Sequence, residues 1–258
     1  MSYTRLLFEK KPPIAIVTLH EPEKRNPFSP VLVREMTEIL AQMASDDDVI
    51  VVIFTGSGSA FSGGADLREM RKATALEDRG EYEHILTLNR LIWSYPKVTI
   101  SAVNGPALGL GANLVAWSDI AIAEERATIG YPEVRAGIAS ATVVPALLRL
   151  VGRKAMNEML FTGRPVDASE AHRLGLVNRV VANGESLTEA IKLATEIAQN
   201  APHGLAFTKE VVRTATDMEY NKALDYARDI RVISRLHAGF QSRIDNYLGK
   251  GDAKKEKP

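Results

Sequence analysis

The stretch Ala60-Phe61-Ser62-Gly63-Gly64-Ala65-Asp66-Leu67 joins two segments that predict different secondary structures. Before it, residues 49–55 form a short apolar run rich in β-branched side chains, which has the length of a buried strand. After it, residues 66–72 have the pattern of the first turns of a helix, with an acid near the start. We therefore predict a glycine-containing turn whose main-chain amides point outward at the start of a helix and favour negative charge.

The order strand, glycine turn, helix recurs later in the chain. Residues 98–103 have the pattern of a strand, the turn Asn104-Gly105-Pro106-Ala107-Leu108-Gly109-Leu110-Gly111 follows it, and a short helix is expected at about 111–117. Further strands are predicted at 14–19 and 120–123. This repetition favours an α/β fold built as a stacked spiral of β-β-α units.

The helices between these strands are predicted from spacing and capping signals. A serine followed by a proline begins an amphipathic helix at 30–44. Residues 71–80 are charged and include a glycine, so we expect a mobile connection there, with a helix resuming near Glu81 and continuing to Tyr95.

The C-terminal part of the chain has a mostly helical pattern. Helices are expected near 185–199, over 203–237 with a break around Asp217, and at 239–248. We therefore predict two domains, a core at 1–200 and a separate helical lobe at 201–258.

Length and composition restrict the class of protein. A chain of 258 residues can bury a large core, and its 45% hydrophobic and 25% charged residues are ordinary for a soluble globular protein. The formal net charge of +0 gives no general attraction to nucleic acid or to an anionic membrane, so neither partner is expected. Residues 1–20 lack the apolar centre of a signal peptide, and no apolar run is long enough to cross a bilayer, so a cytoplasmic location is expected.

Several kinds of catalytic site are excluded by missing residues. The chain has no cysteine, which excludes disulfides and thiolate catalysis. Phe61 stands where a dinucleotide-binding G-x-G-x-x-G motif would need its third glycine, and no P-loop, G-x-S-x-G or H-E-x-x-H motif is present. The five histidines are scattered without the spacing of metal ligands, so no metal is expected.

The glycine turns offer main-chain donors instead of reactive side chains. Two amide groups from two separate turns could bind one developing oxyanion. The enolate formed in this way needs only a nearby carboxylate to move a proton. The alternative is that these glycines only allow strands and helices to pack closely, and the spacing alone leaves both interpretations open.

A set of short motifs in a fixed order adds information that the single turns lack. The set comprises Phe61-Ser62-Gly63-Gly64-Ala65-Asp66-Leu67, Asn104-Gly105-Pro106-Ala107-Leu108-Gly109-Leu110-Gly111, Ser118-Asp119-Ile120-Ala121-Ile122-Ala123, Tyr131-Pro132-Glu133, Leu160-Phe161-Thr162-Gly163 and Gly175-Leu176-Val177. In this order the motifs resemble those of the enoyl-CoA hydratase/isomerase (crotonase) family. The resemblance extends to about Leu248, and the ordered set is specific although each single motif is loose.

The resemblance implies a fold, a substrate and an assembly. The fold would be a crotonase-type spiral of β-β-α units with a C-terminal helical lobe that forms a homotrimer or a dimer of trimers. The substrate would be an acyl-CoA thioester, so coenzyme A would enter as part of the substrate and no separate cofactor would be needed. The chemistry would be that of an enoyl-CoA hydratase, which is a lyase, or of an enoyl-CoA isomerase.

The resemblance also assigns roles to main-chain amides. The thioester oxygen would lie between the N–H groups of Ala65 and Leu110, although the family's usual residue at the second position is glycine. The segment Ala65-Asp66-Leu67-Arg68 would contact the substrate. Arg25 would meet a phosphate of coenzyme A, unless it is an ordinary solvated surface charge.

The family's hydratases use two glutamates, and here one of the two positions holds a carboxylate. Glu133 follows a proline in the later loop and is the expected acid/base. The other position holds Asn113, which cannot act as a base but can orient water. Hydration and a shift of the double bond both stay open, as do thioester hydrolysis by the same amides and binding of acyl-CoA with little catalysis.

Overall fold

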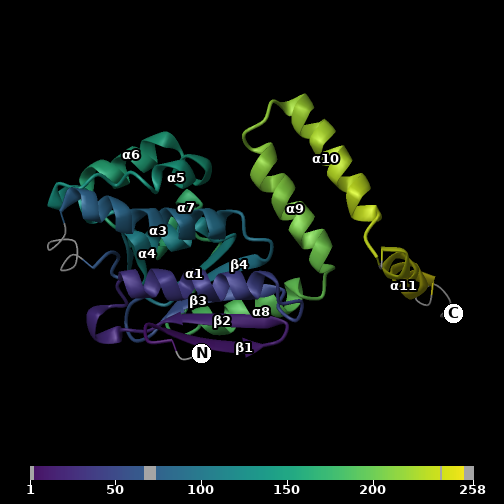
Figure 1. Ribbon diagram of the computed structural model, residues 1–258, viewed down its shortest axis with the longest axis horizontal. Helices are drawn as coiled ribbons and strands as arrows, with labels where there is room; N and C mark the ends of the chain where they lie inside the picture. Colours follow the sequence, from purple (N-terminus) through teal and green to yellow (C-terminus); the bar gives the residue numbers. More distant parts are fainter. Residues whose placement is uncertain (1–2, 67–73, 239, 253–258) are drawn as a thin grey trace. The chain divides into compact units, whose positions relative to one another are not determined.

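The computed structural model describes residues 3–66, 74–238 and 240–252 (Figure 1). The chain divides into two compact units, the first ending at Gln199 and the second beginning at Asn200. The strands of the described residues all lie in the first unit, and the second unit consists of helices and their connections.

A six-stranded sheet forms the centre of the first unit, with the strand order β1-β2-β3-β4-β6-β9. The strands are β1 (Leu6–Lys11), β2 (Ile14–Leu19), β3 (Val51–Gly56), β4 (Val98–Val103), β6 (Ile120–Glu124) and β9 (Arg179–Val181). β1 and β2 run antiparallel, and the other neighbours run parallel. Parallel strands are covered on both faces, which is why β3 is a continuous apolar run and is buried along nearly its whole length.

A short second sheet contains part of the second glycine turn. Its strands are β5 (Ala107–Leu108), β7 (Thr128–Gly130) and β8 (Val166–Asp167), in the order β5-β7-β8. The sequence predicted Ala107 and Leu108 as turn residues, but they pair in parallel with Ile129 and Gly130. A two-residue strand is too short to produce the alternation from which strands are predicted.

Helices cover both faces of the six-stranded sheet. Side chains such as Ile16, Ile53 and Ile100 form one core cluster with Ala190 and Ala194 of α8. The other face packs in a second cluster with α1, α3 and α4. The helices that the described residues of this unit form are α1 (Pro30–Ala44), α3 (Ala75–Trp93), α4 (Leu110–Trp117), α5 (Val144–Leu150), α6 (Arg153–Thr162), α7 (Ala168–Leu174) and α8 (Ser186–Ile197), with short 3-10 helices η1 (Pro22–Lys24) and η2 (Pro132–Ala136).

The helix predicted at 30–44 is confirmed with its capping signal. The hydroxyl of Ser29 accepts a hydrogen bond from the Leu32 amide at 3.3 Å, and Pro30 is the first helical residue. The buried side chains of α1 recur at helical spacing. They are Leu32, Val33, Met36, Ile39, Leu40 and Met43.

The predicted start of the next helix near Glu81 is wrong. α3 begins at Ala75 because Thr74 and Glu77 form a capping box, in which the Glu77 amide donates to Thr74 Oγ1 at 3.3 Å and the Thr74 amide donates to the Glu77 carboxylate at 2.8 Å. Gly80 lies within the helix, where glycine costs only about 1 kcal/mol. The rest of the expected mobile connection, and the helix expected at 66–72, fall largely on residues 67–73, which lie outside the described residues.

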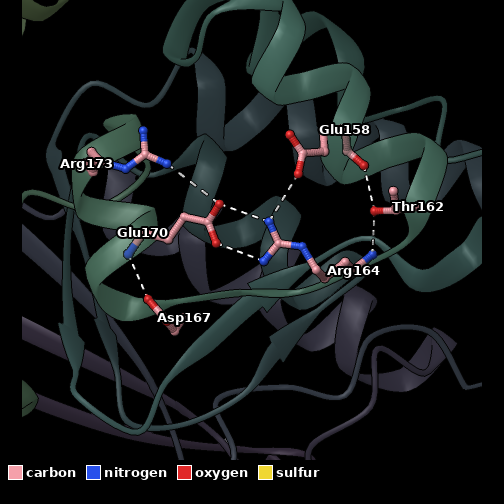
Figure 2. A network of polar contacts seen from close by, with 6 residues as sticks. All are labelled: Glu158, Thr162, Arg164, Asp167, Glu170 and Arg173. Carbon is pink, nitrogen blue, oxygen red and sulfur yellow. Dashed lines mark hydrogen bonds and ion pairs between the residues drawn. The ribbon is translucent and has the colours of Figure 1, made fainter.

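An ionic network joins the end of α6 to the start of α7 (Figure 2). Arg164 donates to both carboxylate oxygens of Glu170, at 2.9 and 3.0 Å, and also lies 3.5 Å from the Glu158 carboxylate. Asp167 caps α7 by accepting from the Glu170 amide at 2.8 Å. The Arg164 guanidinium lowers the pKa of Glu170 below its usual value.

The second unit contains three helices among the described residues, α9 (Pro202–Ala215), α10 (Tyr220–Arg235) and α11 (Phe240–Asp252). The break expected around Asp217 is confirmed, because α9 ends before it and α10 begins after it. Several apolar side chains of α10 are exposed within this unit, namely Leu224, Val232 and Ile233. In the part of the chain that the structure describes, no helix combines the length and the apolar character needed to cross a bilayer.

Candidate active site

The two glycine turns lie against each other in the first unit. Ser62 forms a parallel bridge with Ala107, and the Leu108 amide donates to the carbonyl oxygen of Ser62 at 2.9 Å. A Cβ atom added at Gly64 would lie 2.7 Å from the carbonyl oxygen of Leu108 and 3.5 Å from Cα of Gly109. This approach of the two main chains therefore requires glycine at position 64.

Each turn presents a main-chain amide for which the described residues provide no acceptor. These are the amides of Ala65 and Leu110. Each follows a glycine in the left-handed region, Gly64 at φ 95° and Gly109 at φ 52°. Leu110 is the first residue of α4, where an amide has no acceptor within the helix. Its side chain is 4% exposed and packs in the hydrophobic core, so this leucine contributes to the core and keeps its amide available.

The Glu133 carboxylate lies beside the second turn. Glu133 belongs to η2, which follows β7, and its side chain is half-buried. A Cβ atom added at Gly109 would lie 2.9 Å from Oε1 of Glu133. The Ser140 hydroxyl donates to Oε2 at 2.9 Å, so one carboxylate oxygen is held and the other faces the glycine that precedes the Leu110 amide.

Tyr131 connects the loop that carries Glu133 to α4. Its ring is fully buried, and its hydroxyl donates to the carbonyl oxygen of Ala112 at 3.3 Å. Burial, with a smaller contribution from the charge of Glu133, raises the pKa of Tyr131 far above its usual value. Tyr131 therefore stays neutral and remains a hydrogen-bond donor at physiological pH.

Asn113 lies one helical turn beyond Gly109. Its main-chain N–H donates to the carbonyl oxygen of Gly109 at 2.9 Å, and the residue is 2% exposed. Its Nδ2 contacts Thr142 Oγ1 at 3.4 Å, while its Oδ1 has no partner among the described residues. A buried amide oxygen without a donor is uncommon, and a bound water or ligand usually completes such a site.

A cavity of about 350 Å³ opens between α3, α4 and α5. Thr142, the contact of Asn113, is among its lining residues, so the cavity begins next to Asn113. Most of its lining is apolar, with Leu86, Trp93, Trp117 and Ala146 among the residues, and Asn89, Arg90 and Arg149 add polar groups. Space of this size and character suits an extended apolar group.

Of the predicted substrate-binding residues, some lie beside the first turn and others lie outside the described residues. The side chain of Arg25 is exposed, its residue is left-handed at φ 62°, and its carbonyl oxygen accepts from the Gly63 amide at 2.7 Å, so it lies next to the first turn. Asp66 directly follows Ala65 and is half-buried. Leu67 and Arg68 lie outside the described residues.

Three residues of the site have no role in the predictions made from sequence. Asn26 and Ser62 are fully buried and hydrogen-bonded to the first turn, and Ser140 donates to Glu133. A local signal existed for Asn26, because asparagine tolerates the left-handed conformation that it adopts at φ 52°. Within residues 3–66, 74–238 and 240–252, no group of three or more His, Asp and Glu side chains is arranged to hold a metal ion.

Comparisons with known proteins give the class of this protein. The family model for enoyl-CoA hydratase/isomerase matches residues 9–257. An enoyl-CoA hydratase homologue of Thermus thermophilus is 45% identical over 202 residues, which cover 77% of this chain and 80% of that protein. The short-chain-enoyl-CoA hydratase of Clostridium acetobutylicum is 32% identical over 228 residues, which cover 88% of this chain and 87% of that protein.

Solved structures give the same answer for the fold. A crystal structure of an enoyl-CoA hydratase from Bacillus anthracis has a TM-score of 0.92 at 28% identity and covers 96% of this chain and 97% of that chain. The chain belongs to the enoyl-CoA hydratase/isomerase family, and its fold is the crotonase fold. The predicted fold class is therefore confirmed, and the protein is an acyl-CoA-processing enzyme of that class.

Proposed function

We propose that this enzyme hydrates 2-enoyl-CoA thioesters or shifts the double bond of 3-enoyl-CoA thioesters, with Glu133 as the acid/base. The observation that carries the proposal is the position of the Glu133 carboxylate beside Gly109, which precedes the Leu110 amide, while the Ala65 amide lies in the adjacent turn. Two such donors stabilise the negative charge that develops on a thioester oxygen. A carboxylate at the same place is what proton transfer at the neighbouring carbon requires.

The chemistry starts from a polarised thioester. The amides of Ala65 and Leu110 donate to the thioester oxygen, which withdraws electrons from C3 of a 2-enoyl group. In hydration, Glu133 takes a proton from water, the water oxygen bonds to C3, and the C2–C3 π electrons form an enolate. Protonated Glu133 then gives that proton to C2, the thioester carbonyl reforms, and the carboxylate is regenerated. In isomerisation, Glu133 removes a proton from C2 of a 3-enoyl group and returns it to C4 while the double bond moves to C2–C3.

In the proposed reaction, Asn113 supplies an uncharged hydrogen-bonding group. Its Oδ1, which has no partner among the described residues, can accept a hydrogen bond from the attacking water. Its Nδ2 is already directed to Thr142. A site with a single carboxylate suits the isomerase reaction, in which one group moves the proton, and it suits hydration if Asn113 orients the water.

Charge and shape suggest which residues contact the acyl chain and the coenzyme A portion of the substrate. The mostly apolar cavity between α3, α4 and α5 takes the acyl chain. Arg25, an exposed residue beside the first turn, meets a phosphate of coenzyme A. Asp66, Leu67 and Arg68 remain the proposed contacts of the nucleotide and pantetheine portions. Coenzyme A arrives with the substrate, and no separate cofactor is needed.

We also propose that the enzyme works in the cytoplasm as a homotrimer or a dimer of trimers. The apolar side chains that α10 exposes within its own unit support contact with another copy. Static light scattering of the purified protein should then give three or six times the mass of one chain, and a monomer would contradict this part of the proposal.

The decisive experiment follows both reactions with one protein preparation. Trans-2-butenoyl-CoA and trans-3-hexenoyl-CoA are supplied separately, and the enoyl absorbance and the product mass are recorded. Glu133→Gln should lower turnover by roughly 100-fold or more, since it removes the proton-transfer group. Glu9→Gln, at an exposed position on β1, is the matched control and should leave turnover unchanged.

The same assay distinguishes the alternatives. Release of free coenzyme A thiol without hydration would show a thioester hydrolase. Binding of both substrates with no turnover, measured by calorimetry, would show an acyl-CoA-binding protein. Near-normal turnover by Glu133→Gln would remove Glu133 from the mechanism.

A further inference from the structure

We propose that Ser62 is a positioning residue for the reaction, and that its hydroxyl fixes the Gly64 amide so that the next amide, that of Ala65, is held in register with the Leu110 amide. The inference rests on the proposed function, because it concerns the amide that binds the thioester oxygen. It goes beyond that function by naming the side chain on which the geometry of the donors depends.

The Ser62 hydroxyl both donates and accepts a hydrogen bond. It is fully buried, it donates to the carbonyl oxygen of Asn26 at 2.7 Å, and it accepts from the Gly64 amide at 3.1 Å. A serine hydroxyl has a single donor, so the bond to Asn26 orients its lone pairs toward Gly64. The hydroxyl therefore holds Gly64 in the left-handed conformation, at φ 95°, from which the Ala65 amide projects.

The acceptor of this hydroxyl is itself rigidly held. Asn26 is fully buried, and its Nδ2 donates to the carbonyl oxygens of Ser57 and Ala60, each at 2.9 Å. Its Oδ1 accepts from the Glu21 amide at 2.9 Å. The Asn26 main-chain amide also donates to the carbonyl oxygen of Glu21 at 3.0 Å. Main chain and side chain of Asn26 are therefore both held, and its carbonyl oxygen gives the Ser62 hydroxyl a fixed acceptor.

Ser62 contacts the second turn as well as the first. Its main chain is bridged to Ala107 and bonded to the Leu108 amide. A Cβ atom added at Gly111, the second residue of α4, would lie 2.6 Å from Cβ of Ser62. One residue therefore lies against the start of α4, which carries the Leu110 amide, and also controls the turn that carries the Ala65 amide.

The alternative role for Ser62 is packing alone, and it makes a different prediction. A packing residue affects the stability of the fold, whereas a positioning residue also affects how strongly the two amides polarise a bound thioester. The frequency of the thioester C=O stretch reports that polarisation directly, and it can be measured whether or not the substrate turns over. The matched control is Ser101→Ala, because Ser101 is also fully buried, its hydroxyl lies 2.8 Å from that of Ser118, and it belongs to β4.

The experiment compares full-length wild type, Ser62→Ala, Ser62→Cys and Ser101→Ala. Trans-2-butenoyl-CoA labelled with ¹³C at the thioester carbonyl is bound to each protein, and infrared difference spectra, kcat, KM and Tm are recorded. We expect Ser62→Ala to lose part of the lowering of the C=O frequency and roughly tenfold in kcat, with KM changed less than about threefold. Ser101→Ala should lower Tm but keep the wild-type C=O frequency and kcat.

Other outcomes decide against the inference or separate it from the proposed function. If Ser62→Ala does not fold, Ser62→Cys, which keeps a weak donor and acceptor, should show a smaller change in the same direction. A wild-type C=O frequency and a kcat within about twofold of wild type in the Ser62 variants would overturn the inference. If the wild type lowers the frequency without turnover, the proposed reaction fails, and the Ser62 variants still test the positioning role by frequency alone. If the wild type binds the ester without lowering the frequency, both are overturned.

Discussion

Gly109 and Glu133 are in such close contact that a single methyl group added to the glycine would lie 2.9 Å from Oε1 of the carboxylate. The absence of a side chain at Gly109 is therefore a condition for the position of Glu133. The same glycine adopts φ 52° directly before the Leu110 amide, so one residue affects both the proposed donor and the proposed base.

Gly109→Ala should lower kcat by roughly 100-fold, since the new methyl displaces a group that has to be placed within about 1 Å. It should also lower the free energy of unfolding by about 1 kcal/mol or more, because alanine is strained at positive φ. Gly137→Ala is the control, since Gly137 also has positive φ (74°) but no atom lies within 4 Å of its added Cβ. Steady-state kinetics and urea unfolding of both variants test this, and an equal loss of kcat in the two would contradict it.

Ser140→Ala should lower kcat by roughly tenfold while KM changes little, since it removes the hydrogen bond that holds Oε2 of Glu133. Ser140→Thr keeps the hydroxyl and should recover most of the activity. Initial rates over a range of substrate concentrations separate kcat from KM. A Ser140→Ala enzyme with wild-type kcat would show that Glu133 needs no support from this side.

Asn26→Ala should lower the free energy of unfolding by about 2–3 kcal/mol, because it leaves the Glu21 amide and the carbonyl oxygens of Ser57 and Ala60 without their partner. Asn26→Gly loses the same hydrogen bonds but avoids strain at φ 52°, so it should be more stable than Asn26→Ala by about 1 kcal/mol. Urea unfolding of the two variants measures this difference. An alanine variant at least as stable as the glycine variant would show that the left-handed conformation is not retained.

Arg164→Gln should destabilise the protein at neutral pH and have less effect in acid. Arg164 lowers the pKa of Glu170 below its usual value of 4.5, so the pair stabilises the fold fully above that pH, and the contribution is lost as pH falls through the lower folded-state pKa. The difference in Tm between variant and wild type should therefore be larger at pH 7 than at pH 3. Arg173→Gln should have a smaller effect, because Arg173 lies 3.7 Å from Glu170 and is largely exposed.

Local signals predicted much of the fold, as the helix at 30–44 shows. The serine cap, the proline and the apolar spacing all lie within a few turns of one another, so sequence alone contains them. The predicted start of α3 is wrong although the signal that sets it is equally local. The capping box of Thr74 and Glu77 lies in a charged segment that also contains Gly80, and the prediction used that composition without considering a cap at Thr74.

The candidate site was predictable only where the family resemblance supplied contacts between distant segments. Ala65, Leu110 and Glu133 belong to three separate segments, namely the first turn, the start of α4 and η2, and no periodicity in the chain indicates that they meet. The hydrogen bond from Ser62 to Asn26 spans 36 positions in the sequence. Such pairs become visible only when the order of the strands is known, which explains why the supporting residues were not predicted while the helices were.

The amides of Ala65 and Leu110 have a consequence for how this protein can evolve. A main-chain N–H is present whichever amino acid is encoded, so among single substitutions only proline deletes the donor directly. The side chains at both positions can therefore change while the capacity to bind an oxyanion is inherited intact. Mutations that damage that capacity are expected instead at neighbours that set backbone direction, where glycine or a buried hydroxyl cannot be exchanged freely.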